Sequence, residues 1–92
     1  MTSSLSDTAL AGRTVELAPV RVNAVAPGTV DGALWAGRPD DVRRQAFDHI
    51  AATSVIERPV TEPEVAAAVV HLLLATGTTG SVLYPDGGYS LR

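Results

Sequence analysis

The 92-residue chain contains no cysteine and no lysine, and each absence removes a group of chemistries. Without cysteine there is no disulfide, no thiolate nucleophile and no cysteine-based metal site. All seven basic residues are arginine, ten residues are acidic, and the net charge is −3. Because contact with nucleic-acid phosphates requires clustered basic residues, this composition predicts no nucleic-acid partner. The adjacent Arg43 and Arg44 are predicted to lie on a solvated helix face.

Long apolar runs and aromatic residues are also scarce. No run approaches the ~20 residues that span a bilayer, so no membrane partner is expected. The first residues lack the basic start and apolar stretch of a signal peptide, which favours a cytoplasmic protein. Aromatic residues make up 4% of the chain, so the core is built mainly of Val, Leu and Ala. A chain this short buries only about 60–65% of its unfolded surface, so we expect one domain, residues 1–92, of modest stability.

The order of elements along the chain is helix, strand, helix, helix, strand. Apolar residues at helical spacing predict helices from Ser6 or Asp7 to about residue 18, over 40–53 and over 62–75, with a helical turn near 33–35. Hydrophobic strands are predicted over 20–26 and 81–84, and two such strands joined through helices are expected to be parallel. Small or β-branched residues on both faces of 20–26 suit a strand between two helix layers. The predicted fold class is α/β.

Local signals sharpen the second half of this prediction. Thr61 and Glu64 have the spacing of a capping box, which places the start of the last long helix. We expect that helix to bury Val65, Val69, Leu72 and Leu73. Gly77 is placed to end it in a left-handed conformation. Residues 85–88, Pro-Asp-Gly-Gly, predict a tight turn.

Three stretches resemble the C-terminal half of the short-chain dehydrogenase/reductase family, in the family's order: VELAPVRVNAVAPGTV, RPVTEPEVAAAVVHLLL and TGTTGSVLYPDGGYSL. Together they cover most of residues 9–91. The resemblance implies part of a Rossmann-like, doubly wound fold, with 20–26 and 81–84 as two parallel strands and three to four helices around them. It also implies an NAD(P)-dependent oxidoreductase, whose cofactor lies across the carboxyl ends of the strands.

The same resemblance implies which residues lie beside the nicotinamide ring of NAD or NADP. The Pro-Gly loop after the first strand supplies them: Pro27, Gly28, Thr29 and Val30. Many family members carry a threonine two residues after the valine of this loop, where its hydroxyl bonds the cofactor. Here that position is Gly32, which has no hydroxyl to offer.

The catalytic parts of the family pattern are missing from these 92 residues. There is no glycine-rich cofactor turn and no Tyr-x-x-x-Lys pair, in which the tyrosine exchanges the proton and the lysine lowers its pKa. We therefore predict no catalytic residue, no metal site, and no cofactor binding or activity by this chain alone, as for a truncated gene or half of a split enzyme. The alternative is a non-enzymatic oligomerisation or interaction module derived from the family.

The remaining candidates for chemistry are assigned structural roles. Four polar side chains with no catalytic pattern around them are interpreted as packing or surface groups: His49, His71, Tyr84 and Tyr89. Ser54, His71 and Asp86 could form a triad on paper, but nothing resembles a nucleophile elbow. Trp35 and Phe47 are expected to pack in the core, with a place in a substrate pocket as the alternative.

An unprotected strand edge predicts association. The strand over 20–26 has no lysine and no internal proline, and Arg21 is its only charge. With one neighbour strand it would leave a row of N–H and C=O groups unpaired. We therefore expect a homo-oligomer or a partner, joined through this edge or through the helix over 62–75 and the strand over 81–84.

Overall fold

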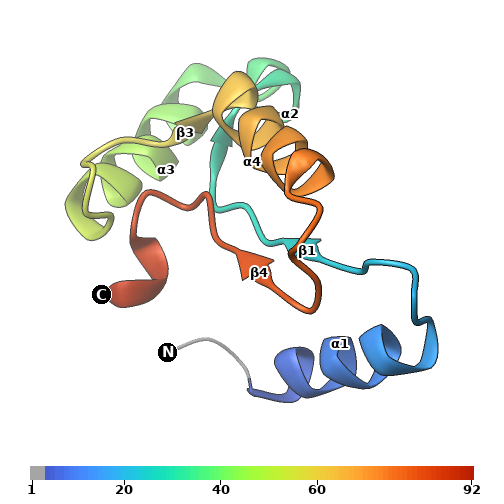
Figure 1. The fold of residues 1–92 in the computed structure, drawn as a ribbon. Coiled ribbons are helices and arrows are strands. Elements are labelled where there is room, and N and C mark those ends of the chain that lie inside the picture. Colours follow the sequence, from blue (N-terminus) through green and yellow to red (C-terminus); the bar gives the residue numbers. More distant parts are fainter. Residues whose placement is uncertain (1–3) are drawn as a thin grey trace.

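The computed structural model describes residues 4–92, with side chains from residue 8 onward. Helices and strands follow one another along the chain (Figure 1): α1 Ser4–Glu16, β1 Ala24–Val25, β2 Val30–Asp31, α2 Ala33–Ala36, α3 Asp40–Thr53, β3 Val60–Thr61, α4 Glu62–Leu74, β4 Val82–Leu83 and the 3₁₀ helix η1 Tyr89–Leu91. The predicted α/β class is confirmed. So is the parallel pairing of the two predicted strands, because β1 and β4 lie side by side and run the same way.

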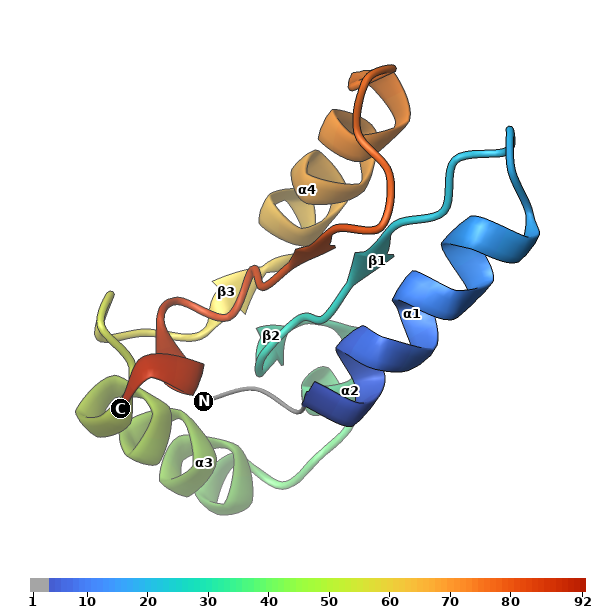
Figure 2. The ribbon, with the colours of Figure 1, turned by 60° about the horizontal axis from the view of Figure 1, so that its bottom comes forward.

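The β1·β4 pair forms the centre of the fold. Ala24 lies opposite Val82 and Val25 opposite Leu83. The N–H of Ala24 donates to the carbonyl of Ser81 (2.9 Å), and that of Ala26 donates to the carbonyl of Leu83 (2.8 Å). Helices α4 and α1 lie on opposite sides of this pair in both views (Figures 1 and 2). The small and β-branched residues of β1 are therefore sandwiched between helices, as their pattern predicted.

The first strand is shorter than the predicted span of 20–26. Val20 is 63% exposed, and its N–H donates to the carbonyl of Leu17 in a turn. The N–H of Val22 donates to a side-chain oxygen, Thr79 Oγ1, rather than to a backbone carbonyl. The alternating apolar pattern extends further along the chain than the backbone hydrogen bonds to β4 do. The pattern therefore overestimates the length of the strand.

A second parallel pair, β2·β3, was not predicted. Val30 lies opposite Val60 and Asp31 opposite Thr61, in segments interpreted as a loop and a connection. The N–H of Val60 also donates to the carbonyl of Thr29 (3.1 Å). Val60 is only 4% exposed, so it joins the small core together with Ile50 and Leu72. This pair fixes the segment after β1 to the start of α4.

The long helices have nearly the predicted bounds, but their packing differs. α3 spans the predicted residues, α4 ends one residue early, and the turn near 33–35 is α2. α1 begins at Ser4, so Ser6 and Asp7 do not start it, and their side chains lie outside the described residues. The predicted burial of Leu73 and Val69 is wrong, because they are 66% and 41% exposed. Helix α4 is apolar on nearly every side, and periodicity alone cannot select the buried face.

Arg21 closes the C-terminal end of α4 (its side chain comes from the segment before β1). Its Nη1 donates to the carbonyls of Leu72 (3.0 Å) and Ala75 (3.1 Å), and its Nη2 donates to that of Leu73 (3.1 Å). The predicted left-handed end at Gly77 is wrong, since Gly77 has no positive φ. A cation at a helix C-terminus satisfies free carbonyls and complements the helix dipole. Arg21, the one charged residue of the predicted strand, therefore binds the C-terminal end of α4 to the segment before β1.

Replacement of Arg21 by methionine tests this closure. Arg21→Met keeps an apolar stem but removes the charge-assisted hydrogen bonds, so we expect a loss of about 1–3 kcal/mol in the free energy of unfolding. Urea unfolding followed by circular dichroism measures it. Arg13→Met is the matched control, because among the described residues Arg13 pairs with Glu16 on an open surface, and its loss should change stability by less than about 0.5 kcal/mol. Equal effects of the two changes would contradict the role of Arg21.

Candidate active site

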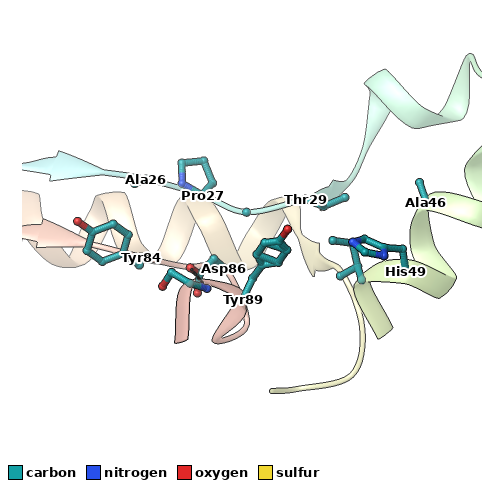
Figure 3. Close-up of a pocket in the computed structure, with 11 residues that line it drawn as sticks. Ala26, Pro27, Thr29, Ala46, His49, Tyr84, Asp86 and Tyr89 are labelled. Carbon is teal, nitrogen blue, oxygen red and sulfur yellow. Dashed lines mark hydrogen bonds between the residues drawn. The ribbon is translucent and has the colours of Figure 1, made fainter. Parts of the chain in front are cut away.

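A cavity of about 550 Å³ opens at the carboxyl ends of β1 and β4 (Figure 3). Its walls come from the loop after β1, from α3, and from the chain after β4. The lining residues are Ala26, Pro27, Gly28, Thr29, Ala46, His49, Ile50, Tyr84, Asp86, Tyr89 and Ser90. Open α/β sheets bind ligands at this edge. Its mixture of apolar, aromatic and few polar groups is typical of small-molecule sites.

Gly28 forms the floor of the cavity by a close backbone contact. Its N–H donates to the carbonyl of Pro85 (3.3 Å), which continues the β1·β4 ladder past the strands. A Cβ at position 28 would lie 2.8 Å from Cβ and 2.9 Å from Cα of Asp86. Only glycine therefore lets the loop and the turn after β4 approach this closely.

The predicted tight turn at residues 85–88 is present. Gly87 and Gly88 have φ of 64° and 82°, which side chains other than glycine rarely adopt. The Gly87 carbonyl accepts hydrogen bonds from the N–H groups of Val55 (2.8 Å) and Ile56 (3.1 Å), just after α3. The turn thus ties the end of the chain to the helix that forms the opposite wall.

The carboxylate of Asp86 is occupied within this turn. Its two oxygens accept from the backbone N–H groups of Gly88 (2.9 Å) and Ser90 (3.2 Å). Burial raises the pKa of Asp86, but hydrogen bonds from the Ser90 side chain and from these backbone groups outweigh it, and the pKa lies below its ordinary value. Asp86 is therefore an ionised group that orders the turn, which disfavours it as a proton donor.

The predicted cofactor residues are divided between two hollows. Pro27, Gly28 and Thr29 line the cavity. Val30 begins β2 and lines only a neighbouring hollow of about 350 Å³ that Gly28 and Thr29 also border. Trp35 packs edge-on against Phe47, with ring centroids 5.8 Å apart. Both rings are half-buried and lie outside the core of Ile50, Val60 and Leu72, so the predicted core position is wrong for both. Whether Pro27, Gly28, Thr29 and Val30 contact a cofactor stays a prediction.

Three residues that the sequence analysis assigned to packing or to the surface line the cavity. His49 projects from α3, while Tyr84 and Tyr89 come from the segments after β4 (Figure 3). Tyr84 follows a predicted strand directly, so its place at a carboxyl end could have been derived from the sequence. His49 and Tyr89 gave no such signal, because tertiary contacts bring their elements together. His71 does not line this cavity, and the paper triad with Ser54 and Asp86 has no support.

Comparisons with known proteins identify the family. A family model described as enoyl-(acyl carrier protein) reductase matches residues 9–90. The chain belongs to the short-chain dehydrogenase/reductase family. A short-chain dehydrogenase/reductase of Stachybotrys chlorohalonatus is 33% identical over 86 residues, 94% of this chain and 34% of that protein. The cis-4-hydroxycyclohexanecarboxylate dehydrogenase of Sinomonas cyclohexanicum is 44% identical over 73 residues, 77% of this chain and 28% of that protein.

Solved structures agree with this family and with the predicted Rossmann-like class. A small-chain dehydrogenase in complex with NADPH superposes with a TM-score of 0.83 and 25% identity, over 95% of this chain and 40% of the other. This short-chain dehydrogenase/reductase chain thus spans about a third of the length of the curated relatives it matches.

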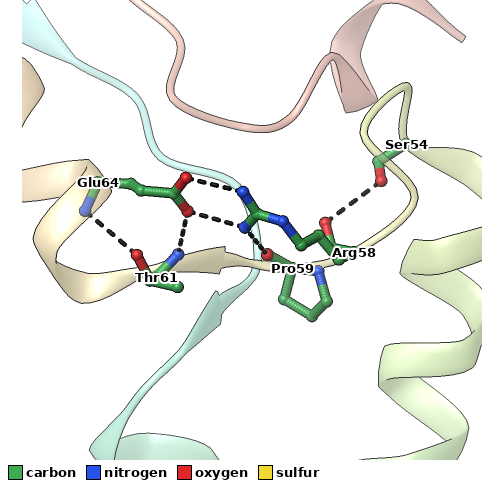
Figure 4. A network of polar contacts seen from close by, with 5 residues as sticks. All are labelled: Ser54, Arg58, Pro59, Thr61 and Glu64. Carbon is green, nitrogen blue, oxygen red and sulfur yellow. Dashed lines mark hydrogen bonds and ion pairs between the residues drawn. The ribbon is translucent and has the colours of Figure 1, made fainter.

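Charged groups outside the cavity have structural roles. Thr61 and Glu64 form the predicted capping box of α4, in which Thr61 Oγ1 accepts from the Glu64 N–H (3.3 Å) and Glu64 Oε1 accepts from the Thr61 N–H (2.8 Å) (Figure 4). Arg58 donates to both Glu64 oxygens, at 2.9 and 2.8 Å. These bonds from Arg58, followed by the backbone bond from Thr61, lower the pKa of Glu64 from 4.5 to about 2. Capping therefore explains this carboxylate without a catalytic role.

The described part of the chain has neither a metal-binding cluster nor a membrane-spanning helix. The side chains described from residue 8 onward include no group of three or more able to hold a metal ion. Over residues 4–92, every helix is too short or too polar to cross a membrane.

A methyl group at position 28 tests the floor of the cavity. Gly28→Ala forces Cβ against backbone atoms of the turn at Asp86, so we expect a loss of about 1–3 kcal/mol in the free energy of unfolding. Gly37→Ala is the matched control, since its Cβ would meet no atom within 4 Å and its φ is −87°. That control should be neutral or slightly stabilising. Equal stability of Gly28→Ala and the native chain in urea would contradict the close contact.

Acid titration tests the Arg58–Glu64 pair. Because the folded pKa of Glu64 is lowered, the pair stabilises the fold above pH 4.5, and this contribution is lost as the pH falls from about 4.5 to about 2. NMR titration of the side-chain carboxyl should give a midpoint near 2. In Arg58→Gln it should move up toward 4.5, and the stability difference between the two chains should shrink in acid. A native midpoint near 4.5 would contradict the pairing.

Proposed function

We propose that this chain forms the nicotinamide-side part of an NAD(P)-dependent oxidoreductase. The observation that carries the proposal is the cavity at the carboxyl ends of β1 and β4, with the Pro27–Gly28 loop as its floor. The family membership supports the same reaction class. We infer that residues 1–92 act as one domain, equivalent to the C-terminal part of the family fold. The composition, with no cysteine, supports a cytoplasmic location.

The cavity suits one end of a dinucleotide. Its apolar and aromatic lining suits a flat ring beside the loop at Pro27, Gly28 and Thr29. No arginine and no α-helix N-terminus lies among the lining residues, so the cavity lacks the groups that usually hold a pyrophosphate. Residues of this chain would therefore orient the nicotinamide, which supplies hydride chemistry when bound. The phosphates require groups from elsewhere.

We propose further that the 92 residues alone transfer no hydride. Proton exchange with a substrate oxygen needs a side chain of suitable pKa within hydrogen-bond reach, and general acid–base catalysis supplies about 10²–10⁴-fold in rate. Asp86 is held ionised by its turn, and the sequence holds no lysine that could form the family's tyrosine–lysine pair with Tyr84 or Tyr89. His49 borders the cavity, but the cavity wall carries no arginine to hold the phosphates of a cofactor in front of it.

For the substrate we propose a secondary alcohol or the matching ketone on a compact apolar body. The name of the Sinomonas cyclohexanicum relative describes the dehydrogenation of a cyclic hydroxy acid. Tyr89 and His49 could contact such a substrate from opposite walls, because both side chains border the cavity.

A second candidate function is a non-enzymatic interaction module. The exposed apolar side chains favour it: among the described residues thirteen large hydrophobic side chains are exposed and three are buried. An interaction module would keep the fold and its surfaces while leaving the cavity unused.

Exchange of segments between relatives tests the enzymatic proposal. In the Sinomonas cyclohexanicum dehydrogenase, the segment that matches this chain is replaced by this chain's residues, which are 44% identical over 73 residues. We expect a folded enzyme that still reduces NAD(P)⁺. Within this chimera, Gly28→Ala should lower kcat/KM, whereas Gly37→Ala should not. A folded chimera that binds the cofactor but has no activity would favour the interaction module.

Calorimetric titration tests the second part of the proposal. The 92-residue chain alone should give no saturable heat with NADH or NADPH at millimolar concentration, because it holds only one end of either molecule. Saturable binding to the isolated chain would refute the claim that the phosphates need other groups.

A further inference from the structure

The parallel ladder β2·β3 brings the side chain of Glu62 beside Gly32. Asp31 lies opposite Thr61, so the residues that follow them, Gly32 and Glu62, are neighbours. A Cβ at position 32 would lie 2.5 Å from Oε1 and 2.9 Å from Cδ of Glu62. The φ of Gly32 is −150°, an extended value that any residue adopts, so space rather than backbone conformation favours glycine here. The glycine leaves room for the carboxylate.

The Glu62 side chain borders the hollow next to the main cavity. That hollow has a volume of about 350 Å³, and Glu62 is the only charged residue in its lining. Gly28 and Thr29 border both the hollow and the cavity, so the carboxylate stands beside the loop at which the nicotinamide ring is proposed to bind. Arg38 stacks on the ring of Trp35, 5.9 Å from its centre, and is not part of the lining.

Glu62 has no partner of its own in the described part of the chain. Among the side chains described from residue 8 onward, it makes no hydrogen bond and no ion pair. The capping box of α4 is complete without it, because Thr61 and Glu64 form both bonds. Arg58 binds both oxygens of Glu64 and forms no ion pair with Glu62. The carboxylate is therefore available to a ligand.

The chemistry of this carboxylate selects what it binds. A carboxylate without a partner beside apolar walls attracts N–H donors and positive charge. A nicotinamide offers both, because its carboxamide group carries two N–H bonds and its ring is cationic when oxidised and neutral when reduced. Charge close to the ring of a cofactor tunes its electronic properties. A carboxylate at this place therefore stabilises the oxidised form more than the reduced form.

We propose that Glu62 is a cofactor-binding residue, which accepts a hydrogen bond from the carboxamide of the nicotinamide and favours NAD(P)⁺ over NAD(P)H. Gly32 has the matching role, since the absence of its side chain admits the carboxylate to the wall of the hollow. The inference rests on the proposed function, because it takes the loop at Pro27, Gly28 and Thr29 as the place of the ring.

Cofactor affinities test the role of Glu62 in the chimera with the Sinomonas cyclohexanicum dehydrogenase. Calorimetric titration with NAD⁺, NADH, NADP⁺ and NADPH gives the ratio of the affinities for the oxidised and reduced forms. Glu62→Gln keeps the size and an acceptor oxygen but removes the charge, so this ratio should fall about threefold to tenfold. Glu57→Gln is the matched control, because Glu57 lines neither hollow and its loss of charge should leave the ratio unchanged.

A second pair of variants tests the role of Gly32. Gly32→Ala places a Cβ against the Glu62 carboxylate and displaces it, so the same ratio should fall. Gly37→Ala adds a methyl group that meets no atom within 4 Å, and the ratio should stay at its value in the chimera.

The outcomes separate this inference from the proposal on which it rests. A ratio unchanged by Glu62→Gln overturns the role of Glu62 and leaves the oxidoreductase proposal standing. A purely structural role at the start of α4 would lower stability without moving the ratio. A folded chimera that binds none of the four cofactors overturns both proposals.

Discussion

The turn at residues 85–88 is the contact on which the arrangement of the cavity depends. Three segments meet there at backbone distance: the loop at Gly28, the residues after α3, and the end of the chain. Each meeting requires a position without a side chain or with a left-handed backbone. The two walls of the cavity are consequently fixed to one another through the turn, although they lie far apart in the sequence.

Hydrogen bonds from polar side chains provide much of the stabilisation that a larger hydrophobic core provides in other proteins. Ile50, Val60 and Leu72 are the buried large apolar residues in the described range, and such a core contributes modestly. Helix α4 is instead closed at both ends by side chains, with Thr61 and Glu64 at its start and Arg21 at its end. These bonds orient the helix on β1·β4 while leaving its outer apolar side uncovered. Local hydrogen bonds thus fix the elements, while much of their apolar surface remains exposed to solvent.

Local signals predicted the parts of the fold that depend on neighbouring residues. The bounds of α3, the capping box at Thr61 and Glu64, and the tight turn all follow from spacings of a few residues. Local spacings did not predict the length of the strands, the β2·β3 pair or the cap at the end of α4. Each of these depends on a partner some 30 to 60 residues away in the sequence. A two-residue strand carries no periodic pattern, and a helix that is apolar on nearly every side does not reveal which side is buried. In the cavity, the Pro27–Gly28–Thr29 floor followed from the family resemblance, whereas the walls at His49 and Tyr89 required the tertiary structure.

Gly28 at the base of the cavity, with Gly87 and Gly88 in the turn behind it, also limits how this surface can diversify. Added atoms at positions 28, 87 and 88 would collide with Asp86, Ile56 and Val55, so mutation can hardly reshape the base. Ala46, His49 and Tyr89 face the same space from α3 and η1 without that restriction. Ligand preference can therefore change through a few substitutions at these wall positions, while the base of the cavity keeps its structure.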